Sequence, residues 1–274
     1  MFSQEKMEIS GSVDWETMRF SAEVTLDLAS AGLKLPAGRT QAESILSANY
    51  LGLIRPYLLE LRADSSSTIG DLVSRGDITL TQTDIIMLGG SAVPPAMKPD
   101  LRRMSVSRTI LLSSMSEYLI RHSRSSRIPR TLTPVSSASY TGIIIIAAEE
   151  LPVYAMRSTA LAVPCLFPKI WDSDMNLIYE RNIMEARNVT MVRYSTPEKI
   201  LQNNPSGLSP ELRQIIGDRP VRIFARSVFG VNPTDLIIDR EDALTIISSE
   251  ENRQLLSQGK VVIILDDSVL RHGF

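Results

Sequence analysis

The sequence has very little of the residue types that most often carry metal or redox chemistry. Its 274 residues include one cysteine and two histidines. A single cysteine, Cys165, excludes an intrachain disulfide framework and a cysteine-ligated zinc site. Because it follows Pro164 in an apolar stretch, we expect a buried, unreactive thiol. His122 and His272 have no partner at metal-ligand spacing, so we expect exposed histidines and no metal or cofactor.

Long apolar runs are also missing. No stretch approaches the roughly 20 residues that a membrane span needs, so we expect no transmembrane segment. The formal net charge of -2 gives no reason to expect nucleic acid as a partner. Met1 leads directly into polar residues rather than into a signal peptide. The sequence is therefore consistent with a cytoplasmic protein, or with an exported protein whose leader has been removed.

Short catalytic motifs are absent as well. The sequence contains no glycine-rich phosphate loop, no Gly-x-Ser-x-Gly elbow and no His-Glu-x-x-His helix. Asp172, Asp174 and Asn176 match the first three ligand positions of a calcium loop, but Leu177 and Ile183 stand where such a loop needs glycine and glutamate. We therefore interpret this stretch as the turn of a β-hairpin.

The pattern that is present is that of an α+β protein. The length allows one large domain or two ordinary domains, each with its own core. Residues 122–139 consist mainly of Ser, Arg, Thr and Pro, which is typical of linkers and long loops. We predict two small α+β domains, 1–130 and 140–274, joined by a linker at 131–139. Each should contain a mixed or antiparallel sheet packed with short helices.

Periodicity and capping residues predict the elements of the first half. In order, they are a strand pair at 7–28, a helix opened by a capping box at 40–43, a short helix at 68–76, a strand at 78–88 and a loop at Pro94-Pro95. Pro56 lies inside the long helical pattern, so we expect it to kink or split that helix. Residues 101–120 fit either a strand or a helix.

The clearest pattern of the second half lies in residues 219–267. Val221, Ile223 and Ala225 alternate with more polar positions, which predicts a strand with one wetter face. The wholly apolar runs 143–146 and 261–265 predict strands buried on both faces. The remaining expected elements are a hairpin at 166–180, a turn at 232–235, short helices after Thr196 and Ser209, a helix capped by Asp239 and a helix opened by a capping box at 248–251.

Arginines form the sharpest charge feature. Seven of them accompany one acidic residue, Glu117: Arg102, Arg103, Arg108, Arg121, Arg124, Arg127 and Arg130. The last four are candidate partner-binding residues, which would bind the carboxylates of another protein or an anionic lipid. Because aromatic residues do not alternate with these arginines, single-stranded nucleic acid is not expected. A solvated linker explains the same arginines equally well.

The second half resembles a known group of proteins. The residues that carry the resemblance are YTGIII at 140–145, FPKIWD at 167–172 with LIY at 177–179, NPTD at 232–235, IDREDA at 238–243 and GKVVI at 259–263. Their order is similar to that of bacterial envelope proteins of the LPP-type lipoprotein group, which includes the flagellar-accessory proteins FlgP and FlgT. The first half resembles the small domain of those proteins, so that the resemblance covers most of residues 38–266.

The resemblance implies a non-enzymatic periplasmic protein that builds or stabilises a scaffold around the flagellar motor or in the cell envelope. It supplies no catalytic residues. Relatives are often anchored by a lipid on an N-terminal cysteine, whereas the cysteine here is internal, so we expect a soluble periplasmic form that associates with itself or with protein partners. The alternative is a ligand-binding or hydrolase-like protein with a site between the domains, formed by Asp235, Asp239 and Arg226.

Overall fold

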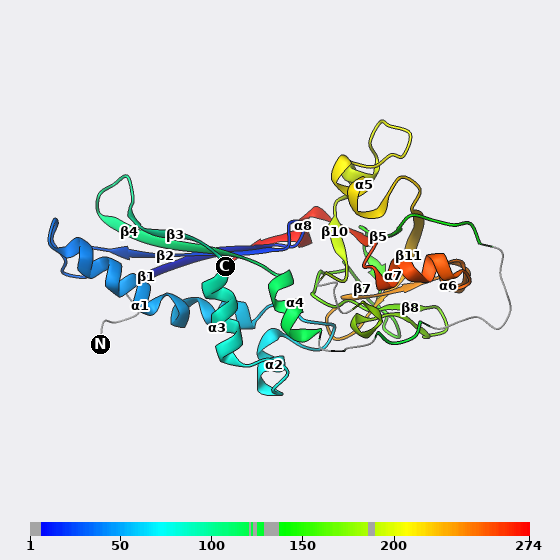
Figure 1. Ribbon diagram of the computed structural model, residues 1–274, viewed down its shortest axis with the longest axis horizontal. Helices are drawn as coiled ribbons and strands as arrows, with labels where there is room; N and C mark the ends of the chain where they lie inside the picture. Colours follow the sequence, from blue (N-terminus) through cyan, green and yellow to red (C-terminus); the bar gives the residue numbers. More distant parts are fainter. Residues whose placement is uncertain (1–6, 121, 123–124, 129–136, 186–189) are drawn as a thin grey trace.

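The first half of the chain is built around an antiparallel sheet. The computed structural model describes residues 7–120, 122, 125–128, 137–185 and 190–274. Five strands form this sheet in the order β14-β1-β2-β4-β3. They are β1 (Met7–Asp14), β2 (Arg19–Asp27), β3 (Ser91–Met97), β4 (Arg103–Leu111) and β14 (Arg271–Gly273). Helices α1 (Gly38–Leu59), α2 (Ile69–Ser74), α3 (Leu80–Gly89) and α4 (Ser113–Leu119) lie on one side of it (Figure 1).

Alternating side chains explain why the helices cover only one face. Val24 and Leu26 of β2 pair with Val106 and Met104 of β4, and all four are buried towards α1. The alternate positions carry polar residues: Glu23 beside Ser107, and Thr25 beside Ser105. A strand with this period of two has one apolar face to cover and one that faces water.

The second half is built around a seven-stranded mixed sheet with the order β10-β13-β5-β11-β12-β8-β9. Its strands are β5 (Ile143–Ala147), β8 (Ile170–Asp172), β9 (Leu177–Tyr179), β10 (Arg193–Ser195), β11 (Val221–Phe229), β12 (Asp235–Ile238) and β13 (Val261–Leu265); β6 (Leu151–Pro152) and β7 (Thr159–Ala160) form a separate pair. The helices are η2 (Arg181–Ile183), η3 (Pro197–Ile200), α5 (Pro210–Ile216), α6 (Arg240–Ile247), α7 (Glu250–Ser257) and α8 (Asp267–Leu270). The predicted α+β class, with one antiparallel and one mixed sheet, is confirmed.

The two halves share one hydrophobic core. A single cluster of buried side chains runs from β1 and α1 to β5, β11 and β13, while a smaller cluster lies beneath α5. In addition, β14 leaves the second half and pairs with β1, at Ser12↔Gly273 through Asp14↔Arg271. The strand β14 therefore belongs to the sheet of the first half, although it follows the second half in the sequence.

Several predicted elements of the second half are confirmed. β13 is buried along its whole length and lies between β10 and β5, as its apolar sequence predicts. β8 and β9 form the predicted hairpin around 172–176. Ser209 caps α5 with Pro210 at the first helical position. The helix at 250–257 is capped by Ser249, which accepts a hydrogen bond from Asn252, rather than by the predicted box at 248–251.

The predicted strand at 78–88 is wrong, because this segment forms α3. Thr79 caps the helix through a capping box with Gln82, a signal that the apolar run concealed. Short apolar runs fit a helix as well as a strand when periodicity alone is considered. In addition, the predicted loop at Pro94-Pro95 lies within β3, an edge strand with a register shift between Val93 and Ala96. Proline is tolerated on edge strands because they need not donate every backbone hydrogen bond.

The predicted start of the long helix is also wrong. α1 begins at Gly38 after Ala37, without a side-chain cap, so residues 40–43 do not form a capping box. The helix continues through Pro56 to Leu59 rather than being split there. The short helix predicted at 68–76 is confirmed as α2, and the side chain of its N-cap Thr68 accepts a hydrogen bond from the Asp71 backbone N–H. Among the described residues, no helix combines the length and apolar character that a membrane crossing requires.

Candidate functional site

The predicted arginine surface is only partly within the described residues. Arg121, Arg124 and Arg130 lie outside them. Arg127 is exposed and lies in a shallow pocket beside α7, and its role in binding a partner stays a prediction. The segment that carries it is attached to the second half, because the Ser126 backbone N–H donates to Asn182 O over 2.7 Å.

The earlier arginines of the series have partners on the first sheet. Arg103 forms an ion pair with Asp100, with 2.7 Å between Nε and Oδ2. Arg108 donates to the carbonyl of Leu88 and lies over the ring of Tyr50, 5.9 Å from its centroid. The positions of Arg103 and Arg108 in β4 differ by five, an odd number, and the two side chains therefore lie on opposite faces of the strand. The described arginines therefore do not gather into one basic surface.

Cys165 and the two histidines can be placed. Cys165 is fully buried, which confirms the predicted burial, and burial raises the pKa of its thiol to about 12; that the thiol is unreactive stays a prediction. His122 is half-buried, with 2.7 Å between its Nε2 atom and Met184 O; it is therefore not the exposed side chain that the sequence predicts. His272 is exposed on β14.

The predicted trio of Asp235, Asp239 and Arg226 does not form one site. Arg226 and Asp239 form an ion pair on the surface, 2.7 Å between Nε and Oδ2. Asp235 is buried at 1% exposure and binds other groups. Its carboxylate accepts hydrogen bonds from the Lys169 backbone N–H (3.1 Å), Trp171 Nε1 (3.3 Å), Ser65 Oγ (3.1 Å) and Thr234 Oγ1 (3.3 Å).

Asp235 instead connects the two halves, because Ser65 lies in the loop 62–68 of the first half. This loop, which we name the junction loop, also accepts backbone hydrogen bonds from Leu166, Phe167 and Asn232 of the second half. Burial raises the pKa of Asp235, and the hydrogen bonds from Lys169, Trp171 and Ser65 oppose that rise. A buried carboxylate with several donors stabilises one geometry of the groups around it.

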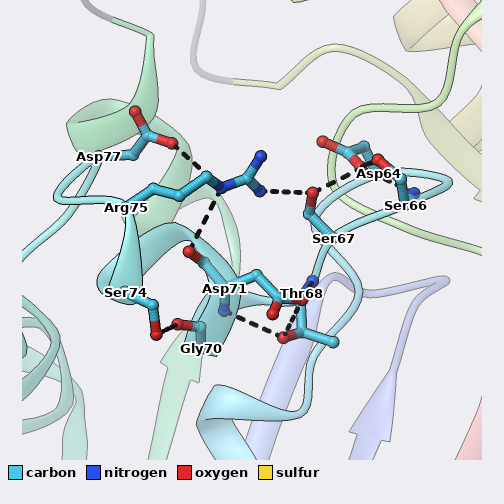
Figure 2. A network of polar contacts seen from close by, with 9 residues as sticks. All are labelled: Asp64, Ser66, Ser67, Thr68, Gly70, Asp71, Ser74, Arg75 and Asp77. Atoms are coloured by element: carbon cyan, nitrogen blue, oxygen red, sulfur yellow. Dashed lines mark hydrogen bonds and ion pairs between the residues drawn. The ribbon is translucent and has the colours of Figure 1, made fainter.

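The junction loop is held in shape by its own polar contacts (Figure 2). Asp64 Oδ1 accepts hydrogen bonds from the backbone and hydroxyl of Ser66. Arg75, at the end of α2, donates to Ser67 Oγ and to the carbonyl of Asp71. These contacts fix the backbone on both sides of Ser65, so that its hydroxyl faces Asp235.

The largest cavity that we describe is a groove at one end of the first sheet, which we name the α3–α4 groove. Its volume is about 590 Å³, and it is lined by Arg19, Ile85, Ile86, Gly89, Gly90, Ser91, Thr109, Ile110, Leu111, Ser114, Glu117 and Tyr118. Ile85 and Leu111 are 53% and 51% exposed. Apolar side chains exposed together in a concave surface are typical of a binding site.

The sequence positions the walls of the α3–α4 groove. Arg55 of α1 forms a two-pronged ion pair with Asp84 of α3, with 2.8 Å between Nη2 and Oδ2, which fixes this helix against the long helix. The chain then turns at Gly90 directly over β4: a Cβ atom there would lie 2.5 Å from Cγ2 of Ile110. Sequence reasoning missed this groove because it assigned α3 to a strand, although the box Thr79-Gln82 could have revealed the helix.

Comparison with known proteins matches each half of the chain to a family model for one domain of a bacterial protein. Residues 6–118 match the family model described as the N-terminal domain of Treponema pallidum Tp0624, and residues 142–267 match the model described as its second domain. No curated protein matches the chain. The expected resemblance is thus confirmed at the level of a bacterial protein family, while its relation to the LPP-type group stays a prediction. The two halves of this chain are similar, in the same order, to two domains of one bacterial protein family.

Proposed function

We propose that the chain is a non-enzymatic assembly protein of the bacterial cell envelope that acts in the periplasm through protein–protein contacts. The bacterial family of both halves supports this proposal. The resemblance of residues 140–263 to LPP-type proteins supports an association with the flagellar motor. The observation that carries the proposal is the α3–α4 groove, which presents apolar side chains to solvent and is also lined by two groups of opposite charge, Arg19 and Glu117.

The partner that fits the α3–α4 groove is a second copy of this chain. Arg19 and Glu117 both line the groove, and neither forms an ion pair among the described residues. In a two-fold symmetric dimer each surface patch meets its own copy, so that residue i contacts j and j contacts i. A patch that carries one cation and one anion beside an apolar centre is complementary to itself. Arg19 of one copy would face Glu117 of the other.

Ile85 would lie in the centre of this contact and supply most of its free energy. Apolar side chains buried in the middle of an interface contribute more than the charged rim, which mainly sets orientation and specificity. We therefore expect Ile85→Asp to weaken self-association by about tenfold or more. Val231→Asp is the matched control, because Val231 is 89% exposed and does not line the groove.

Light scattering over a range of protein concentrations tests this proposal on the full chain. We expect a concentration-dependent rise in molar mass for the wild type and for Val231→Asp, and a monomer for Ile85→Asp. Circular dichroism should show the same helix content in all three proteins. A wild type that stays monomeric at every concentration, or an Ile85→Asp variant that associates as the wild type does, would contradict the proposal.

A further inference from the structure

The end of the chain closes a second, smaller cavity between the two halves, which we name the terminal cavity. Phe274 exchanges backbone hydrogen bonds of 3.1 and 3.2 Å with Gly11 of β1, next to the pairing of β14 with β1. The terminal cavity has a volume of about 240 Å³ and is lined by Val13, Trp15, Tyr57, Glu60, Leu61, Arg62, Thr68, Asn232, His272 and Phe274. Sites for drug-sized ligands measure roughly 300–1,000 Å³, so that this one suits a smaller molecule.

Two stacked rings form a flat wall of the terminal cavity. The ring centroids of Tyr57 and Phe274 are 4.3 Å apart with an interplanar angle of 18°. Phe20 stacks on Phe274 at 5.4 Å. The ring of Phe274 can lie here only because residue 11 is glycine, since a Cβ atom at that position would be 2.2 Å from the ring. Phe274 is therefore fixed between Tyr57, Phe20 and Gly11, and these rings give the cavity an aromatic wall against which the edge or outer face of an apolar group can pack.

Arg62 supplies the positive charge of the terminal cavity. No carboxylate among the described residues forms an ion pair with it. The nearby Arg271, in contrast, is 2.7 Å from Glu16 and 3.5 Å from Asp14. A guanidinium presents several N–H donors in a fixed plane and binds a carboxylate with two parallel hydrogen bonds. Glu60 also lines the cavity and is exposed; its charge would oppose a ligand that carries two negative charges.

The other polar groups of the terminal cavity are neutral. Partial burial, and then the charge of Arg62, lower the pKa of His272, so that its ring is uncharged near neutral pH. The backbone of Asn232 is fixed by a hydrogen bond to Ser65 O, whereas its side-chain amide has no partner within the described part of the chain. An unpaired amide in the wall of a cavity can bind a polar group of a ligand.

We propose that the terminal cavity binds a small monocarboxylate with a flat, apolar body. The carboxylate lies on Arg62, and the flat body lies against Tyr57 and Phe274. This inference goes beyond the proposed function, because the cavity is separate from the α3–α4 groove. Since Asn232 belongs to the second half, whereas Arg62 and the strand β14 with His272 belong to the first, the ligand would contact both halves and stabilise their junction.

Fluorine NMR titrations with 4-fluorobenzoate test this proposal on the full chain. We expect saturable binding, and binding of the neutral isostere 4-fluorobenzamide at least about tenfold weaker, because a hydrogen bond to a charged group contributes about 1.5–3 kcal/mol. Arg62→Gln should lose affinity for 4-fluorobenzoate by a similar factor. Arg226→Gln is the control, since that arginine is paired on the surface and does not line the cavity.

A second variant separates the role of the flat wall from that of the charge. Phe274→Leu keeps an apolar side chain but removes the flat ring. We expect this variant to bind 4-fluorobenzoate more weakly than the wild type, although Arg62 is still present. Urea denaturation of each variant shows whether it is folded. Equal binding of the amide and the acid, equal binding by Arg62→Gln and the wild type, or no saturation up to about 10 mM would overturn the proposal. The light-scattering result for the α3–α4 groove does not depend on this outcome.

Discussion

Asp235→Ala should measure how much the hydrogen bonds at the junction between the two halves contribute to the free energy of unfolding. The substitution leaves the buried donor on Ser65 and the partly buried donors on Lys169 and Trp171 without their acceptor. An unsatisfied buried donor costs about 1–3 kcal/mol. The variant also removes the cost of burying the carboxylate, which raises the pKa of Asp235. The net loss should therefore lie below the simple sum, at about 2–4 kcal/mol.

A loss of this size is a large part of the usual stability of a folded protein, about 5–15 kcal/mol. In thermal unfolding it corresponds to a Tm lower by roughly 5–10 °C. Urea denaturation followed by circular dichroism measures the free energy of unfolding. Asp239→Ala is the control, because its ion pair with Arg226 is exposed and contributes about 0–1 kcal/mol. The reasoning is refuted if Asp235→Ala loses no more stability than Asp239→Ala.

Three further outcomes follow from single sites. Gly11→Ala should destabilise the fold by about 1–3 kcal/mol because its Cβ would overlap the ring of Phe274, whereas Gly52→Ala, with open space around it in α1, should be neutral or stabilising in urea denaturation. Cys165 should resist iodoacetamide in the native protein and react fully in urea, as mass spectrometry would show; rapid native alkylation would contradict its burial. Burial raises the pKa of Asp235, so the native state holds its proton more tightly than the unfolded chain, and the stability that this gives is lost as the pH rises from 3.8 through the raised pKa. Asp235→Asn cannot ionise at this position and does not lose stability in this way. The difference in the free energy of unfolding, variant minus wild type, should therefore increase over that pH range. A difference that stays constant would contradict the raised pKa of Asp235.

The sequence predicted the second half well because local and tertiary preferences agree there. The run 261–265 is apolar at every position, and a strand of this kind is stable only where both of its faces are covered. Ser209 with Pro210 fixes the start of α5 by capping chemistry alone. In the first half, residues 80–89 misled the prediction because the helix leaves Leu80, Ile85 and Leu88 exposed.

The candidate sites depend on contacts between distant parts of the chain, which periodicity does not encode. Ser65 and Asp235 are 170 positions apart. The terminal cavity requires β14 to return to β1, and three residues of strand are too short to give a recognisable pattern. The sequence alone does not distinguish the exposed apolar side chains of the α3–α4 groove from the apolar side chains of a buried helix or strand. The sequence therefore shows which residues can form helices and strands, but not which exposed surfaces lie together.

Charge reversal with rescue is the most direct test of the central claim that two copies associate through the α3–α4 groove. Light scattering should show a dimer for the wild type and a shift towards monomer for Arg19→Glu and for Glu117→Arg, because each variant places like charges opposite each other. The double variant exchanges the two charges and should return to the dimer. If both single variants dimerise as the wild type does, or if the double variant is no better than the single ones, the groove is not the contact between copies.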